Sequence, residues 1–212
     1  MNKYLVNESS IESEFEPPLF LFAHGAGADM NHAFMEQVAK GLASKGIKVV
    51  RFNFPYMIKR AEDGKKRPPD RAPKLLEAYQ KVIADLATQP VVIGGKSMGG
   101  RMASLLADEP LVAGIACLGY PFHPPGKPEK YKGEHLATLD KPCLILQGDR
   151  DTMGTKEEVS TFDLSSSIAV EYLPDGDHSF KPRIRSGHTE EQNIALTVEK
   201  LSQFIIEVSN AK

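Results

Sequence analysis

The sequence predicts an α/β protein whose mostly parallel central sheet is covered by helices on both faces. Strand patterns and helix patterns alternate from residue 19 to the end of the chain. Several strand patterns are short, near-continuous apolar runs, such as 114–119 and 142–147, which is typical of strands buried on both faces. Amphipathic helices, which have one apolar face to pack on a sheet, separate several of the predicted strands.

Six short segments rich in β-branched and aromatic residues predict the strands. They are 19–23, 48–54, 90–93, 114–119, 142–147 and 168–173. Pro55 ends the second strand because proline has no N–H to donate to a sheet.

Apolar residues spaced three and four positions apart predict four helices. They are 31–44, 73–87, 98–107 and 189–208. Pro73 opens the second helix, where the first turn tolerates proline. We expect irregular structure in the N-terminal tail, 56–72 and 121–135. The last of these is too short and too rich in Pro and Gly for a large lid domain, so we expect a minimal lid.

Length and composition are those of one ordinary globular domain. The chain has 212 residues, 41% hydrophobic and 25% charged, which fits a single domain over 1–212 with a sizeable core. Residues 1–17 are expected to form a tail or an edge strand. The net charge of −2 favours neither nucleic acid nor an anionic membrane as a partner. The oligomeric state is not predicted.

The lack of a recognisable targeting signal and the positions of the cysteines favour a cytoplasmic protein. The N-terminal residues lack the apolar run of a signal peptide, and no segment approaches the ~20 apolar residues of a membrane span. Cys117 and Cys143 each lie in a predicted central strand, so we expect buried, reduced thiols. A disulfide between neighbouring strands is the alternative.

The segment 90–104 contains the main chemical motif. A β-branched strand leads into Gly95-Lys96-Ser97-Met98-Gly99, and a helical segment follows at once. This is the G-x-S-x-G nucleophile elbow in its strand–turn–helix context, where Gly95 and Gly99 let the strand and helix approach each other. The pattern predicts Ser97 as a nucleophile at the carboxyl edge of the sheet.

Two other interpretations of this motif compete with the elbow. A glycine-rich turn between a strand and a helix can serve packing alone. Gly95-Lys96-Ser97 also matches the end of a phosphate-binding P-loop, which needs a glycine five residues before Gly95. Position 90 is proline, and a strand pattern occupies the place of the flexible loop.

A serine nucleophile needs a base to take its proton and an acid to orient that base. The strand 142–147 runs into Gly148-Asp-Arg-Asp151, which places two candidate acids just past its end. We favour Asp151, because a tight turn at Gly148 needs a few residues to bring a side chain back over the site. Asp149 then bonds backbone N–H groups of the turn; a share in the acid role is left open.

His178 is the candidate base, because it follows the last predicted strand and precedes the closing helix. His188 is the competitor, but it lies at the entry of that helix. Asp175 and Asp177 are expected to shape the turn around His178.

Two backbone N–H groups are needed to stabilise the negative oxygen of a tetrahedral intermediate. The N–H of Met98, directly after the serine, is one candidate. The loop after the first strand supplies the other, for which we choose Ala26, because Gly25 lets the backbone turn its N–H groups inward. His24 is expected to brace this loop by hydrogen bonds rather than to act as a base.

Together these motifs resemble the α/β-hydrolase fold, and the similarity covers nearly the whole chain from residue 18. The chain resembles the compact, lidless members near dienelactone hydrolases. More narrowly, it is similar to small bacterial hydrolases related to the hydrolase-like domains of a nonspecific-lethal chromatin complex subunit and of a testis-expressed protein. The shared segments are 51–56, 67–73, 119–124 and 135–136. One departure is Ser97, since dienelactone hydrolase itself has a cysteine there, and this difference argues against dienelactone as the substrate.

The sequence thus predicts a serine hydrolase that cleaves a small ester, thioester or amide through an acyl-enzyme on Ser97, with no metal or organic cofactor. The alternatives are a non-catalytic hydrolase-like interaction module and an acyltransferase on the same fold. The loops expected around the site carry 14 Lys and Arg against 10 Asp and Glu, a net +4. This excess favours a small, anionic substrate, whereas lysines and arginines that merely solvate mobile loops are the simpler explanation.

Overall fold

The computed structural model describes residues 3–211, which form a seven-stranded sheet in the order β1-β3-β2-β4-β5-β6-β7. Only β1 runs antiparallel to its neighbour, and all the other pairs are parallel. The strands are β1 Tyr4–Asn7, β2 Leu19–Ala23, β3 Lys48–Phe52, β4 Val91–Lys96, β5 Val112–Leu118, β6 Cys143–Gly148 and β7 Ile168–Leu173. The predicted mostly parallel central sheet is confirmed.

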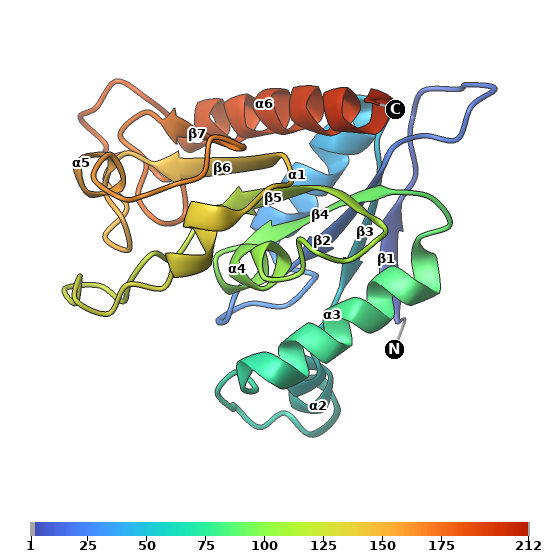
Figure 1. The fold of residues 1–212 in the computed structure, drawn as a ribbon, viewed down its shortest axis with the longest axis horizontal. Coiled ribbons are helices and arrows are strands. Elements are labelled where there is room, and N and C mark those ends of the chain that lie inside the picture. Colours follow the sequence, from blue (N-terminus) through green and yellow to red (C-terminus); the bar gives the residue numbers. More distant parts are fainter. Residues whose placement is uncertain (1–2, 212) are drawn as a thin grey trace.

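Helices cover both faces of the sheet (Figure 1). They are α1 Ala33–Ser44, α2 Pro55–Asp63, α3 Ala72–Leu86, α4 Met98–Ser104, α5 Lys156–Val159 and α6 Glu190–Asn210, with the 3-10 helix η1 Glu134–Thr138. Helices α1 and α6 pack on the face that Phe20 and Phe22 enter, whereas α3 and α4 pack on the face of Leu21. The alternation follows from the two-residue period of a strand.

The segment 56–72 was expected to be irregular, and this prediction is wrong for its first half. The preceding strand was predicted to run to residue 54 and to end at Pro55, but β3 already ends at Phe52. Pro55 instead occupies the first turn of α2, which ends at Gly64 in the left-handed conformation. The helix buries Tyr56 and Met57 and is otherwise largely polar. Because α2 contains so few apolar residues, its sequence shows no helical periodicity of hydrophobic positions. The segment 121–135, also expected to be irregular, contains regular structure only at its end, where η1 begins at Glu134; this holds for the described part of the chain.

Strand β4 is longer than its sequence pattern indicates. The apolar run stops at Ile93, but Gly94 and Gly95 continue the strand and pair with Phe22 and Ala23 of β2. A side chain at Gly94 is excluded, since its Cβ would lie 2.1 Å from the carbonyl oxygen of Ala116. The glycines that interrupt the hydrophobic pattern are therefore required by the close packing of the strands.

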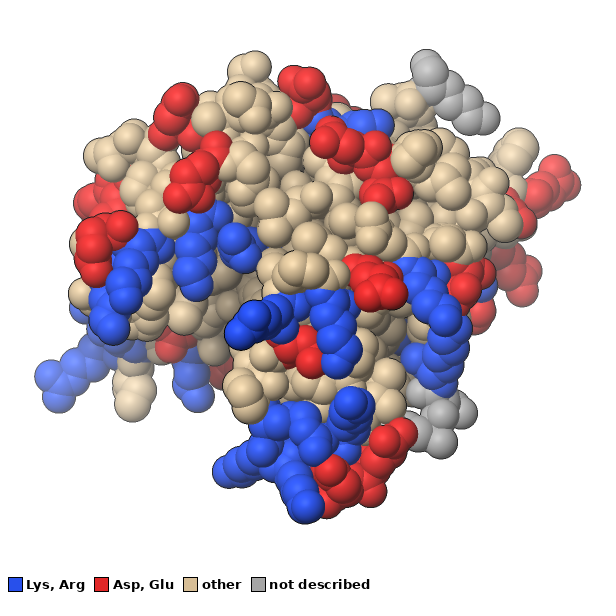
Figure 2. Space-filling view, turned by 60° about the horizontal axis from the view of Figure 1, so that its bottom comes forward, with Lys and Arg blue, Asp and Glu red and all other residues tan. Residues whose placement is uncertain are grey.

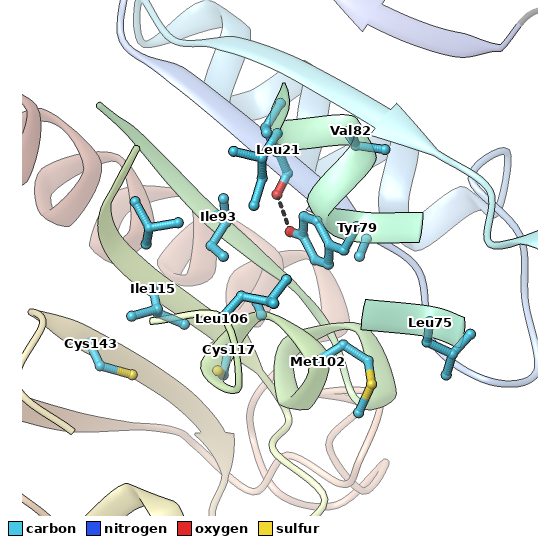
Figure 3. Close-up of a cluster of buried hydrophobic side chains, with 14 of the residues drawn as sticks. Leu21, Leu75, Tyr79, Val82, Ile93, Met102, Leu106, Ile115, Cys117 and Cys143 are labelled. Atoms are coloured by element: carbon cyan, nitrogen blue, oxygen red, sulfur yellow. Dashed lines mark hydrogen bonds between the residues drawn. The ribbon is translucent and has the colours of Figure 1, made fainter. Parts of the chain in front are cut away.

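The two cysteines are free and buried, as expected (Figure 3). They lie on neighbouring strands, with Cys143 paired to Ile115 and Cys117 to Ile145. In residues 3–211, no helix is both long and apolar enough to cross a bilayer.

The hydroxyl of Tyr79 joins α3 to the centre of the sheet (Figure 3). The side chain is fully buried. Its oxygen accepts a hydrogen bond from the Gly94 N–H (2.9 Å) and lies within donating distance of the carbonyl oxygens of Gly94 (2.7 Å) and Leu21 (2.8 Å).

Tyr79→Phe is expected to lower the free energy of unfolding by about 1–3 kcal/mol, because it leaves buried backbone groups without a partner. Urea denaturation measures the change. Tyr172→Phe is the matched control, since the Tyr172 hydroxyl is part-exposed in β7 and makes no hydrogen bond within residues 3–211. An equal loss in both variants would contradict the role given to the Tyr79 hydroxyl.

Candidate active site

Ser97 occupies a sharp turn between β4 and α4. Its φ of 52° and ψ of −116° are outside the regions that residues with a side chain favour, a conformation that costs on the order of 1–3 kcal/mol and is typical of functional sites. The turn is held by the hydrogen bond from the Ser97 N–H to Leu118 O (2.9 Å) and by the first bond of α4, from Arg101 N to Ser97 O (3.0 Å).

Gly95 and Gly99 lie on either side of the turn, where a side chain has no room. A Cβ at Gly95 would lie 2.5 Å from the carbonyl carbon of Gly99, and a Cβ at Gly99 would lie 2.5 Å from Ala23 O. The helix therefore approaches both β2 and β4 at backbone contact distance.

The structure brings Ser97, His178 and Asp151 together at the carboxyl edge of the sheet. His178 Nε2 lies 2.8 Å from Ser97 Oγ, and His178 Nδ1 lies 2.7 Å from Asp151 Oδ2. When Nδ1 carries the proton and donates it to the carboxylate, Nε2 is free to accept the serine proton. This is the hydrogen-bonded arrangement in which a base activates a serine.

Asp151, and not Asp149, contacts the histidine. Asp151 is fully buried; its Oδ1 accepts the Met153 N–H (2.8 Å), and its Oδ2 accepts a hydrogen bond from Gln147 Nε2 (3.0 Å). The prediction that Asp149 bonds the N–H groups of its own turn is wrong: its Oδ2 accepts the Asp175 N–H (2.9 Å) of the histidine loop, because the two loops lie side by side past the ends of β6 and β7.

Gln147 was not identified from the sequence. It is fully buried at the end of β6, where its Oε1 accepts the Tyr120 N–H (2.8 Å) and its Nε2 also lies near the carbonyl oxygens of Tyr120 and Gly154. The signal in the sequence that could have identified Gln147 is its position as a polar residue at the end of an apolar strand. Its amide ties the loops after β5 and β6 to the acid.

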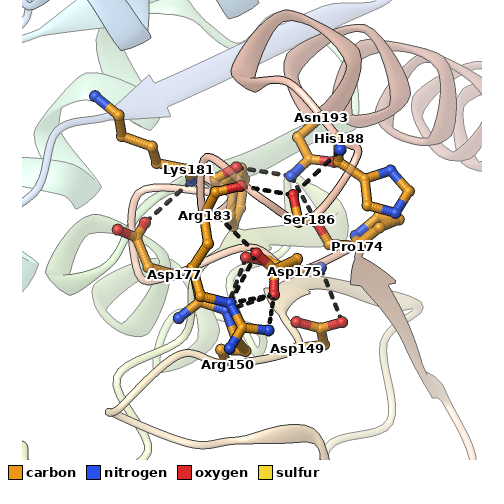
Figure 4. Close-up of polar contacts among 11 residues, drawn as sticks. Asp149, Arg150, Pro174, Asp175, Asp177, Lys181, Arg183, Ser186, His188 and Asn193 are labelled. Atoms are coloured by element: carbon orange, nitrogen blue, oxygen red, sulfur yellow. Dashed lines mark hydrogen bonds and ion pairs between the residues drawn. The ribbon is translucent and has the colours of Figure 1, made fainter.

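The loop 174–188 that presents His178 is held by polar contacts (Figure 4). Asp175 forms ion pairs with Arg183 and with Arg150. Hydrogen bonds from Arg183 lower the pKa of Asp175 to about 2, despite a smaller opposing effect of desolvation. Asp177 accepts the N–H groups of Ser179 (2.7 Å) and Lys181 (3.0 Å), so both aspartates shape the turn.

His188 lies outside this arrangement. It is exposed two residues before α6 begins, and its N–H donates to Ser186 Oγ (3.1 Å; Figure 4). At the base of the loop, Asn193 of α6 donates to the carbonyl oxygens of Pro174 (3.0 Å) and Phe180 (2.8 Å).

Lys96, the residue before Ser97, also holds the histidine loop. Its Nζ donates to His178 O at 2.6 Å and lies over the rings of Phe34 and Phe180. Desolvation lowers the pKa of Lys96 to about 8, although the charges of Asp151 and Asp177 act in the opposite direction. Sequence reasoning did not assign this role, because the partner is a backbone carbonyl 82 positions away.

The loop after β2 passes close to Ser97. A Cβ at Gly25 would lie 3.6 Å from that of Ser97. Neither the Ala26 N–H nor the Met98 N–H has a hydrogen-bond partner in the part of the chain that the structure describes.

His24 and Tyr56 orient the peptide between Gly25 and Ala26. His24 Nδ1 donates to Gly25 O (2.7 Å), because its Nε2 accepts the Phe54 N–H (3.0 Å). The Tyr56 hydroxyl lies 3.3 Å from Gly25 O and 3.0 Å from Ala26 O. Since the C=O and N–H of one peptide point in opposite directions, holding Gly25 O fixes the direction of the Ala26 N–H.

Strand β3 and the residue after it hold the other end of this loop. Asn53 Oδ1 accepts the Met30 N–H (2.9 Å), and Arg51 Nη1 donates to Met30 O (2.8 Å). The segment 51–56, which the sequence analysis treats as the end of a strand and as a shared feature, thus anchors the loop that contains Ala26.

Ser97 and His178 line a cavity of about 850 Å³. Its walls come from the loop 25–29, the start of α1, and helix α2 with Met57 and Arg60. Met153, Lys96 and Glu190 also line it. No cluster of three or more metal-ligating side chains occurs in the described part of the chain.

Residues 16–206 match the model of the alpha/beta hydrolase domain family, so the chain belongs to this family. Est1E from Butyrivibrio proteoclasticus, solved with ferulic acid, has a TM-score of 0.71 at 17% identity, over 97% of this chain and 94% of its own. XC6422 from Xanthomonas campestris, an α/β serine hydrolase without a lid, has a TM-score of 0.67 at 18% identity, over 99% and 90%.

Dienelactone hydrolase from Anabaena variabilis is also similar, with a TM-score of 0.66 at 20% identity, over 90% of this chain and 86% of its own. The resemblance to compact, dienelactone-hydrolase-like serine hydrolases is confirmed at the level of the fold. The narrower similarity to the chromatin-complex subunit and the testis-expressed protein stays a prediction.

The neutral state of His24 makes stability depend on pH. Burial lowers the pKa of His24 to about 4, against about 6.5 in an unfolded chain. The unfolded chain therefore takes up the proton first, and the stability from this group is complete above pH 6.5 and lost as the pH falls toward 4. We expect this group to lower the free energy of unfolding by about 2–3 kcal/mol between pH 7.5 and 4.5.

Urea denaturation of wild type and His24→Gln at both pH values isolates this contribution, because all other groups titrate in both proteins. The variant should lose less stability on acidification than wild type. Equal losses would show that His24 is not held neutral in the folded protein.

Proposed function

We propose that this chain is a serine hydrolase that cleaves a small ester, thioester or amide through an acyl-enzyme on Ser97. The observation that supports this most directly is the continuous hydrogen-bonded chain from Ser97 Oγ through both nitrogens of His178 to a fully buried Asp151. An interaction module has no physical need for this chain of contacts or for a serine at a φ of 52°.

In the first half of the reaction, Ser97 Oγ attacks the substrate carbonyl carbon while His178 Nε2 takes the hydroxyl proton. Asp151 stabilises the resulting imidazolium. The carbonyl oxygen becomes an oxyanion facing the N–H groups of Ala26 and Met98; donors of this kind are each worth on the order of 10²–10³ in rate. Collapse of this intermediate breaks the bond to the leaving group, which takes the proton from His178.

In the second half, a water molecule attacks the acyl carbon and His178 takes its proton. The acyl–oxygen bond to Ser97 then breaks, the proton returns to the serine oxygen, and the carboxylic acid product leaves. Both halves use the same base, His178, and the same N–H donors, Ala26 and Met98. Residues of this chain supply all of these groups. Small, anionic substrates are part of this proposal.

Ser97→Ala is expected to lower kcat by up to about 10⁶ and to abolish labelling by a fluorophosphonate. Ester hydrolysis and labelling of the purified protein measure both effects. Ser104→Ala is the matched control, since Ser104 Oγ also lies 2.8 Å from a histidine nitrogen, on His135, but Ser104 is the last residue of α4 and lies away from the elbow. Labelling retained in Ser97→Ala, or lost in Ser104→Ala, would refute the assignment.

Asp151→Asn is expected to lower kcat by roughly 10⁴, because the amide disfavours the tautomer of His178 that accepts the serine proton. Asp149→Asn should keep most of the activity and mainly reduce stability, since its carboxylate contacts a backbone N–H of the histidine loop. Steady-state kinetics and thermal unfolding of both variants separate the two roles. A larger kinetic loss at Asp149 would reverse the assignment.

A further inference from the structure

A second, shallower hollow adjoins the main cavity beside the loop after β2. Both are lined by Ala26, Gly27 and Arg60, and the second hollow adds Lys66, Arg67 and Pro68. Arg60 therefore lies where the two spaces meet. Ala26, the proposed oxyanion donor, lines both of them, so the second hollow is an extension of the site.

The cations of this hollow differ in their partners. Arg67 pairs with Asp63 at 2.6 Å. Arg60 and Lys66 contact no carboxylate within residues 3–211. Figure 2 shows Lys and Arg side chains gathered at the bottom of the molecule, over α2 and the segment that follows it, with Asp and Glu side chains beside them.

The acidic residues nearby form no ion pair with Arg60 among residues 3–211. Asp70 pairs with Lys74 (2.8 Å), and Glu62 lies exposed on α2 with the cations Lys59 and Lys65 on the same segment.

In the main cavity, the carboxylates have partners of their own. Asp29 accepts the Asn31 N–H (2.9 Å), and Glu190 lies 3.7 Å from Lys181. Lys96, the other cation of the main cavity, is engaged with His178 O. Arg60 is thus a part-buried residue that lines the cavity and has no carboxylate partner within the described residues.

We propose that Arg60, assisted by Lys66, binds an anionic group of the substrate, a carboxylate or a phosphate, in this extension of the site. The inference rests on the proposed hydrolase function and specifies its substrate class as esters or thioesters with an acidic substituent. A guanidinium presents a planar pair of donors that matches either group bidentately. The ammonium of Lys66 adds a second positive charge at the same hollow.

The test compares pairs of esters that differ only in one carboxylate. The first pair, 4-nitrophenyl hydrogen glutarate and 4-nitrophenyl butyrate, places the charge on the acyl side. The second pair, acetoxybenzoate and phenyl acetate, places it on the leaving group. The measured quantity is the ratio of kcat/KM for the charged ester to that for the neutral ester.

Wild type should prefer the charged ester of at least one pair. Arg60→Met should reduce that preference by about tenfold or more, as expected for a hydrogen bond to a charged group. Lys59→Met is the matched control, because it removes the same charge from the neighbouring residue of α2, which does not line either hollow. It should change the preference less than about twofold, as a charge screened by solvent would. An equal loss in both variants would show long-range attraction only and overturn the binding site.

Binding is measured separately on Ser97→Ala by calorimetry, so the inference does not depend on turnover. The charged ester should bind about tenfold more tightly than its neutral partner, and adding Arg60→Met should remove the difference. Equal affinities would overturn the inference even if the wild-type enzyme is active. Conversely, wild type that neither turns over esters nor reacts with a fluorophosphonate would refute the proposed function alone.

Inorganic phosphate and propionate are tested as inhibitors of the hydrolysis of the charged ester, and the stronger inhibitor identifies the preferred anion. Either inhibition should weaken in Arg60→Met and persist in Lys59→Met. Inhibition unaffected by Arg60→Met would place the anion elsewhere and overturn the assignment.

Discussion

The site depends first on how closely α4 approaches strands β2 and β4. Two glycines, Gly95 and Gly99, lie at backbone contact distance from their neighbours, and neither position has room for a Cβ. The chain can therefore reverse within a single residue, and Ser97 adopts the positive φ that turns its hydroxyl out of the sheet. Because the loops after the other parallel strands end at the same edge, the histidine, the acid and the loop of Ala26 all converge on that hydroxyl.

Side-chain bonds to backbone groups then hold these loops in place. A loop beyond a sheet has no ladder to satisfy its peptide groups, and here polar side chains take over. Lys96 holds the carbonyl of the histidine, Gln147 connects the acid to the loop after β5, and Tyr56 with His24 sets the peptide before Ala26. These groups are buried or part-buried, so their bonds are shielded from water and an unpaired partner would be costly.

Elements with clear periodicity could be read from the sequence, and elements without it could not. The strands 19–23 and 168–173 have the predicted bounds, and α6 differs from 189–208 by only one or two residues at each end. Helix α2 was missed because its surface is polar and it buries little. For the site, the motif and the order of the chain pointed to Ser97, Asp151 and His178, but two aspartates only two positions apart remained alternatives until the turn between them was seen.

The sequence by itself determined the class of the fold, the strand–turn–helix setting of the serine and the identity of the residues available for its chemistry, because these follow from local patterns of apolar residues and glycines. Only the tertiary structure decided which groups meet. Ser97 and His178 are 81 positions apart, and Tyr56 reaches a peptide 30 positions before it. Residues so far apart in the sequence meet because parallel strands pack side by side and because buried donors bond to particular carbonyl groups. The same packing leaves Arg60 without a carboxylate partner among residues 3–211 at the edge of the cavity, which no local pattern of charges reveals.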